Sequence, residues 1–171
     1  AIEQLPRWSH LMQQVQEARH YVDRAAALGH PGQFETLHGM LEFLVYFRGA
    51  LNSYAKCFVS SGPGKLRLEC SKVFQTKAEY KNQHSRIIDL RHKYVAHSDA
   101  NQFETYSFET TETVSEIVVA LQYRFLFPFD RLYELRDLIG HLETYVVDAH
   151  AKHIQAIQKQ VGRAVRVSQG E

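Results

Sequence analysis

Residues 132–161 read LYELRDLIGHLETYVVDAHAKHIQAIQKQV, and this stretch decides the fold that the sequence predicts. Its apolar residues recur in nearly regular steps of three and four, which is the spacing of one face of an α-helix. They are Leu132, Leu135, Ile139, Leu142, Val146, Ala149, Ile154, Ile157 and Val161. We therefore expect one long helix that begins after Pro128, followed by a basic tail from about Arg163 that frays.

Three more helices are expected before this one. Apolar residues repeat with helical spacing over residues 2–25 and again over residues 34–58. Gly- and Pro-containing breakers at 29–32 and 60–64 end these two segments. A third helix is expected to cover much of residues 71–96, which gives two long helices before it and one after it.

The apolar spacing changes to two between the third and the last helix. Ile117, Val119, Leu121, Tyr123, Phe125 and Phe127 alternate with a more mixed set, as in a β-strand. Residues 103–110 are β-branched and aromatic and would be the partner strand, although a helix over 114–121 is the alternative. The sequence predicts a mainly α fold in one domain of residues 1–171, a four-helix up-and-down bundle with a β-hairpin inserted before the last helix.

The composition favours a soluble globular protein of the cytoplasm. Hydrophobic residues make up 44% and charged residues 23%, and no apolar run reaches the roughly 18 residues of a membrane helix. The first residues do not resemble a secretion signal, and Cys57 and Cys70 are too few and too far apart for a disulfide framework. The net charge of +1 does not by itself indicate nucleic-acid binding, but ten histidines allow a local basic site.

Arg91 is the unusual residue of the third helix. At about 100° per residue it falls in the middle of an apolar stripe, on which His84 also lies. The stripe consists of Tyr80, Ile87, Ile88, Tyr94 and Val95. Because a guanidinium keeps its charge, Arg91 must pair with a carboxylate, lie at a wet seam or bind an anion. The structural alternative is a buried ion pair with an acid such as Glu42 or Asp89 of a neighbouring element.

His97 follows Arg91 by six residues. On a straight helix the two side chains are separated by about 9 Å of rise and about 120° around the axis, so they do not meet. They converge if the helix ends or bends near Ala96, or if a symmetric second copy contributes its own pair. A lone histidine at a helix end is otherwise a cap or a partner of the helix dipole.

Arg91 and His97, with five residues between them, resemble the Arg-x(4–6)-His motif of the HEPN superfamily. Residues 90–99, LRHKYVAHSD, are similar to the phrase LRNKxxAHxD of its AbiU2-like branch. The chain departs from this pattern at His92, where Asn or Asp is usual. It also carries Asp99 where an antitoxin-linked variant has Tyr.

The resemblance implies a metal-independent endoribonuclease without a cofactor, whose active site is shared across a homodimer. It also implies a role as a toxin or antiphage effector. In that case His97 acts as the general base and Arg91 stabilises the phosphate. His92, Lys93, His84 and Arg48 are candidate phosphate or RNA binders. Arg48 lies within the apolar second helix, so it either joins the Arg91 site or forms a structural pair.

Two other functions stay open. The first is a catalytically silent HEPN module for dimerisation or for binding RNA or nucleotides, and the second is a structural helical interaction protein in which the motif match is accidental. His150 and His153 share a helix face and are the beginning of a metal site. Since a third ligand is not evident beside them, although His141 and Asp148 occur, no metal is expected.

Overall fold

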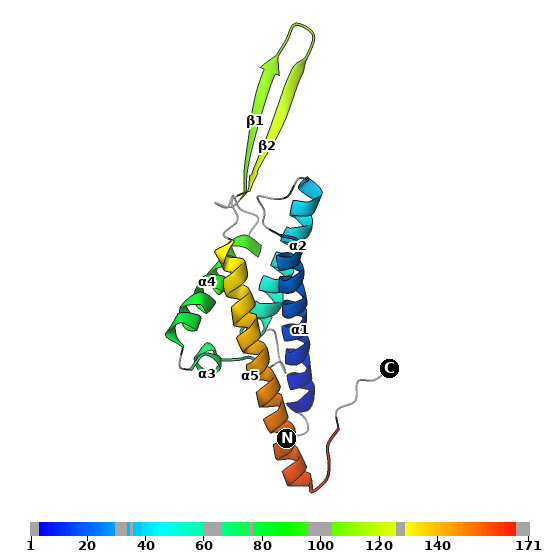
Figure 1. Cartoon of the computed structure of the whole chain (residues 1–171), viewed down its shortest axis with the longest axis vertical. Helices are drawn as coiled ribbons and strands as arrows, with labels where there is room; N and C mark the ends of the chain where they lie inside the picture. The colour runs from blue at the N-terminus through cyan, green and yellow to red at the C-terminus, as the bar shows by residue number, and fades with distance from the viewer. Residues whose placement is uncertain are drawn as a thin grey trace.

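The computed structural model describes residues 4–29, 34, 36–59, 66–75, 77–95, 104–125 and 129–166. In this part of the chain the elements are α1 (Leu5–Ala27), α2 (Leu37–Lys56), α3 (Cys70–Val73), α4 (Ala78–Val95), β1 (Glu104–Glu112), β2 (Ile117–Phe125) and α5 (Asp130–Val161). The predicted fold, mainly helical with a β-hairpin before the last helix, is confirmed (Figure 1).

Two expectations from the sequence can be compared with the structure in detail. The helix expected over much of residues 71–96 is α4, and the single turn α3 precedes it. The alternative helix over 114–121 does not form, because Ile117–Phe125 is a strand.

The four long helices alternate in direction. Figure 1 shows α1 rising from the N-terminal end and α2 descending beside it, while α4 rises toward the base of the hairpin and α5 descends. Helix α1 packs along α2 and α5, and α4 packs against α2 and α5. The seam between α2 and α4 therefore lies at the surface of the bundle, and the C-terminal turn of α4 lies at the hairpin end.

The core is built from the apolar faces that the sequence periodicity predicts. In α5 the residues Leu132, Leu135, Ile139, Leu142 and Val146 are fully buried. They meet buried residues of α1 and α2, among them Val15, Val22, Phe43, Phe47 and Leu51. Each such side chain contributes about 1.5–3 kcal/mol by leaving water, so this shared core holds the helices in register.

Ion pairs on the surface fix α4 and α1 against α5. Glu134 of α5 accepts hydrogen bonds from Arg86 of α4 at 2.6 Å and from Arg131 at 2.7 Å. Burial alone raises the pKa of Glu134, but the two guanidinium groups outweigh burial and hold the pKa below its usual value. On the other side, Arg19 of α1 pairs with Glu143 at 3.0 Å. The pair of Arg86 with Glu134 helps to set the position of α4, which carries Arg91.

Local sequence signals explain where two helices begin and end. The hydroxyl of Thr36 accepts a hydrogen bond from the Gly39 N–H at 3.2 Å and so caps the start of α2. Helix α5 ends at Gly162, whose φ of 67° is a left-handed conformation that favours glycine. The described basic residues beyond it, 163–166, are not helical.

The hairpin projects away from the bundle (Figure 1). Its antiparallel register pairs Glu104 with Phe125 at the base and Glu112 with Ile117 near the tip. Neither strand makes an extensive contact with a described helix, and the side chains of residues 107–121 are all exposed. Within the described residues, no helix is long and apolar enough to cross a lipid bilayer.

Candidate functional site

Arg91 lies at the seam between α4 and α2. Its side chain is half-buried, and its Nε donates a hydrogen bond of 3.4 Å to Oδ1 of Asn52 on α2. Ile87 and Tyr94 of the predicted stripe, and Leu90 beside them, are buried in the core. The helical period therefore places the charged end of Arg91 at the edge of the core, where an apolar floor meets solvent.

Arg48 joins the same seam from α2. Its guanidinium carbon lies 4.8 Å from the centre of the Tyr94 ring, within the range of a cation–π contact. Tyr94 is buried, with its ring 6.5 Å from that of Phe47. Arg48 and Asn52 stand one turn apart on α2 and meet Tyr94 and Arg91 of α4, so the two guanidinium groups belong to one cluster.

The electrostatic partner of Arg91 is a neutral amide. Within the part of the chain that the structure describes, no carboxylate lies within ion-pair distance of Arg91, and the expected structural partners Glu42 and Asp89 do not contact it. An amide oxygen orients a guanidinium without cancelling its charge. Among the described residues, no carboxylate therefore offsets the positive charge of Arg91, whose side chain is half-buried.

Two further sequence candidates follow Arg91 in the chain. His92 and Lys93 are exposed in the last turn of α4, next to Arg91. His97, the expected general base, lies outside the described residues. The cluster that the structure brings together thus comprises Arg48 and Arg91, with Asn52 as the oxygen that holds Arg91. His92 and Lys93 lie about 100° and about 200° around α4 from Arg91, so they do not share its face.

His84 is a core residue and does not belong to this cluster. It is buried among the aromatic rings of Tyr54, Phe58 and Phe74, with the Phe58 ring centre 4.4 Å away. Its Nδ1 shares a hydrogen bond of 2.8 Å with the Tyr54 hydroxyl. Burial lowers the pKa of His84 to about 4, so the ring is neutral at pH 7. A buried neutral imidazole is a poor phosphate ligand, and we leave His84 out of the candidate site.

Sequence reasoning did not foresee Asn52. A polar residue four positions after Arg48 lies on the same helix face, and this spacing was the available signal. The contact itself joins residues 39 positions apart. Only the packing of α4 against α2 reveals that the amide serves Arg91.

The histidines of α5 have separate surroundings. His141 donates from Nε2 to the carbonyl oxygen of Val73 at 3.1 Å, and the His153 ring lies 6.4 Å from that of Trp8. The Nε2 atom of His150 is buried without a hydrogen-bond partner among the described atoms. No group of three metal-ligand side chains occurs in the described ranges. The seam cluster therefore remains the strongest candidate for a site.

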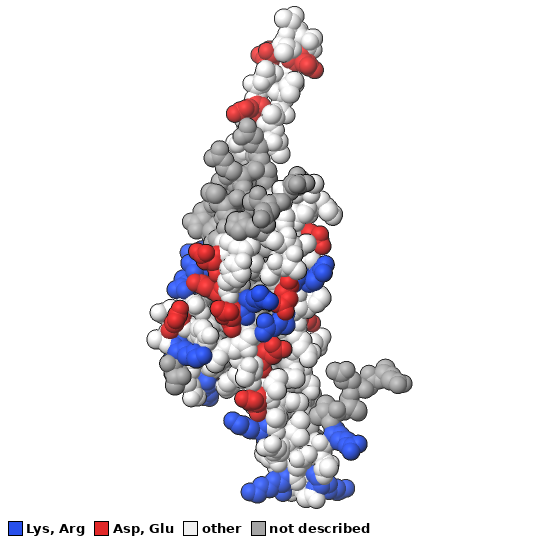
Figure 2. Space-filling view, in the orientation of Figure 1, with Lys and Arg blue, Asp and Glu red and all other residues white. Residues whose placement is uncertain are grey.

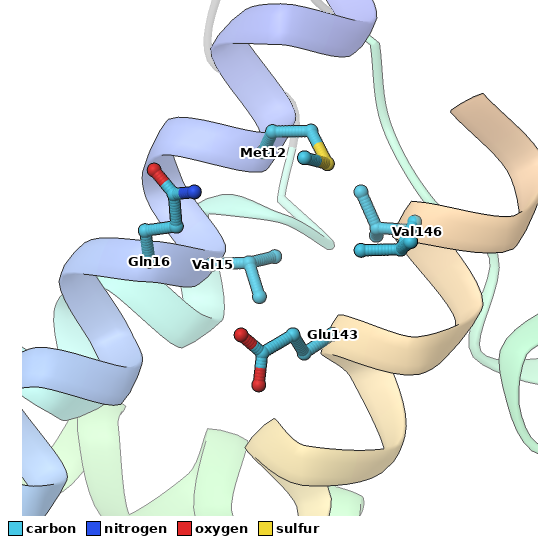
Figure 3. Close-up of a pocket in the computed structure, with 6 residues that line it drawn as sticks. Met12, Val15, Gln16, Glu143 and Val146 are labelled. Carbon is cyan, nitrogen blue, oxygen red and sulfur yellow. The ribbon is translucent and has the colours of Figure 1, made fainter. Parts of the chain in front are cut away.

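A small cavity lies between α1 and α5. Figure 3 shows Met12, Val15 and Gln16 of α1 opposite Glu143 and Val146 of α5. Its volume of about 20 Å³ has room for a water molecule but not for a nucleotide. This cavity is therefore too small to be the candidate site.

Comparisons with known proteins give no relative: no family model, no curated protein and no solved structure matches the chain.

Proposed function

We propose that the chain is a metal-independent endoribonuclease of the HEPN type, acting as a cytoplasmic homodimer and serving as a toxin or antiphage effector. The observation that carries the proposal is Arg91, a half-buried guanidinium whose described partner is the neutral oxygen of Asn52. Arg48 adds positive charge beside it, and Lys93 adds another in the same helical turn. A cluster of this kind suits the phosphate backbone of RNA.

The proposed reaction transfers a phosphoryl group within the RNA strand. His97 removes the proton from a ribose 2′-hydroxyl, because an imidazole has a pKa near neutrality. The 2′-oxygen forms a bond to the adjacent phosphorus, and the bond from phosphorus to the 5′-oxygen breaks. His97 of a second copy gives a proton to the leaving oxygen. The products are a 2′,3′-cyclic phosphate and a 5′-hydroxyl, and DNA is spared since it lacks the 2′-hydroxyl.

In this proposal Arg91 provides electrostatic stabilisation of the phosphate. Its Nε atom is engaged by Asn52, so the terminal nitrogens are the donors that face a phosphate. They stabilise the negative charge that grows on the phosphate oxygens during attack. The apolar floor formed by Tyr94 and Leu90 lowers the local dielectric and strengthens this interaction.

The direct test is incubation of the pure protein with mixed single-stranded RNA in EDTA. We expect the wild type to cleave, and we expect Arg91→Ala and His97→Ala each to lower the rate by about 100-fold or more. Arg86→Ala is the matched control, because Arg86 is an arginine of the same helix that pairs with Glu134 instead. Equal loss in Arg86→Ala would contradict the assigned role of Arg91.

A catalytically silent module that binds RNA or nucleotides is the second candidate. His92 stands where the family usually has Asn or Asp, while the basic cluster is compatible with binding alone. This candidate predicts no cleavage, together with RNA affinity that falls as salt rises. The purely structural interpretation expected Arg91 against a carboxylate, and the Asn52 contact weighs against it.

A further inference from the structure

One face of the hairpin is apolar and uncovered. In the antiparallel register Phe108 lies opposite Leu121, Thr110 opposite Val119 and Glu112 opposite Ile117, and paired residues share a face. Phe108, Leu121, Val119 and Ile117 are between 59% and 72% exposed. An isolated two-stranded hairpin is at best marginally stable in water. This face is therefore suited to burial against a partner.

A second uncovered apolar surface lies on α2. Leu37, Leu41 and Val45 are between 45% and 65% exposed. At 100° per residue they share an arc of about 80° with Arg48 and Asn52, which follow them along the helix. We call these five residues the α2 stripe. Its apolar end is near the hairpin end of the bundle, and its polar end is the candidate site.

The hairpin of the same chain does not cover this stripe. Figure 1 shows the two strands extending away from the bundle, and neither strand makes an extensive contact with α2. Two apolar surfaces are thus left uncovered among the described residues of one chain. A second copy carries the complementary surface for each of them.

The spacing of the two surfaces matches. Phe108 and Glu112 are separated by about 14 Å along β1 at 3.4 Å per residue. Along α2, Arg48 lies about 16 Å from Leu37 and about 10 Å from Leu41, at 1.5 Å per residue. When Phe108 lies between Leu37 and Leu41, Glu112 is level with Arg48, so apolar residues meet apolar residues and the carboxylate meets the guanidinium.

The charges of the two surfaces are also complementary. The hairpin segment 107–121 carries Glu109, Glu112 and Glu116 and has no Lys or Arg. Figure 2 shows acidic side chains on the projecting hairpin. The polar end of the α2 stripe contains Arg48 and lies beside Arg91. Opposite charges of this kind fix the register of an interface and speed its formation.

We propose that the chain forms a two-fold dimer in which each hairpin lays its apolar face along the α2 stripe of the second copy. Packing of hairpin on hairpin is disfavoured because both carry only acidic charge over 107–121. Docking on α5 is disfavoured because its exposed large apolar residues, Tyr133, Val147 and Val161, are 14 positions apart and form no continuous stripe. The proposed docking of the hairpin does not depend on RNA cleavage. In the dimer Glu112 of the second copy pairs with Arg48, so Arg91 is the guanidinium left to bind phosphate in the candidate site.

Sedimentation of the full-length protein tests the proposed dimer. We expect the wild type to be a dimer, and we expect Phe108→Ser with Leu121→Ser to raise its dissociation constant by about 100-fold. Val118→Ser is the matched control, because Val118 is 47% exposed on the opposite face of the same hairpin. A monomeric wild type overturns the proposal, as does equal weakening by Val118→Ser.

Charge reversal tests the docking site on α2. Glu112→Arg and Arg48→Glu should each weaken the dimer by about tenfold, and the two together should restore it. Glu109→Arg, on the opposite face, should have little effect. Circular dichroism shows whether each variant keeps its helices. A dimer that Glu112→Arg leaves unchanged, or a wild type that grows into longer assemblies, overturns the proposed docking.

Discussion

Arg91 shows how far sequence reasoning reaches at the scale of one residue. The helical period predicted that its guanidinium would lie within an apolar stripe, and Ile87, Leu90 and Tyr94 are indeed buried around it. The helical period could not predict the hydrogen-bond partner of Arg91, because Asn52 belongs to another helix and lies 39 positions away. The position of a side chain on its own helix is local information, whereas its contact depends on tertiary packing.

Replacing the neutral partner of Arg91 with an acid should inactivate the site. In Asn52→Asp the new carboxylate pairs with Arg91 and cancels the charge that phosphate needs, so RNA affinity should fall by about tenfold or more. Filter binding or fluorescence anisotropy measures this change. Asn82→Asp adds the same charge at an exposed position of α4 and should have a much smaller effect. Equal losses in the two variants would mean that only net charge matters.

His84 gives the fold a dependence on acid. Its pKa is lowered from 6.5 to about 4 by burial, so between these values the unfolded chain binds a proton that the folded chain does not. Stability is therefore complete above pH 6.5 and falls by up to about 3 kcal/mol as the pH drops through 4. Urea unfolding of the wild type and His84→Gln at pH 7 and pH 4.5 measures it. The wild type should lose more stability than the variant, and parallel losses would contradict this account.

At the scale of elements, the apolar periodicity predicted whether a segment is a helix or a strand better than it predicted where that element begins and ends. The alternation from Ile117 onward predicted β2, and the steps of three and four from Leu132 onward predicted α5. The break between α3 and α4 was not predicted. Apolar spacing alone does not distinguish one helix from a short turn followed by a second helix. Val73 and Phe74 are both buried at this break, so core packing stabilises it.

The contact between α1 and α2 depends on Gly49. A Cβ atom at this position would lie 2.9 Å from Cδ2 of Tyr21, which is closer than packed atoms approach. Gly49→Ala should therefore lower the free energy of unfolding by about 1–3 kcal/mol despite its better helix propensity. Gly140→Ala is the comparison, since its Cβ would meet only the end of the flexible Arg19 side chain, at 3.0 Å. Thermal and urea unfolding should rank Gly49→Ala as clearly the less stable variant.

At the scale of the whole molecule, four alternating helices form the body and the hairpin is an appendage. The apolar faces of the helices were enough to predict the bundle, because antiparallel neighbours are the simplest way to bury such faces. The uncovered surfaces could not be predicted from the sequence. Phe108 and Leu121 look like core residues by type, and only their exposure in the folded chain distinguishes them.

Removal of the hairpin should leave the body intact. Glu104 and Phe125 are paired at its base, so a short turn can join the two sides after residues 105–124 are deleted. Since the strands pack on themselves, the free energy of unfolding of the monomer should change by less than about 1 kcal/mol. The shortened protein should also lose its dimer. Denaturant unfolding at low concentration and sedimentation measure the two effects, and a body that no longer folds would show that the hairpin is part of the core.

The most direct test of the central claim is analysis of the ends that the wild type leaves on RNA in EDTA. The account predicts 2′,3′-cyclic phosphate and 5′-hydroxyl ends, and no cleavage of the same strand carrying 2′-O-methyl groups. Ends with a 3′-hydroxyl and a 5′-phosphate, or no cleavage by a folded dimer, would contradict it.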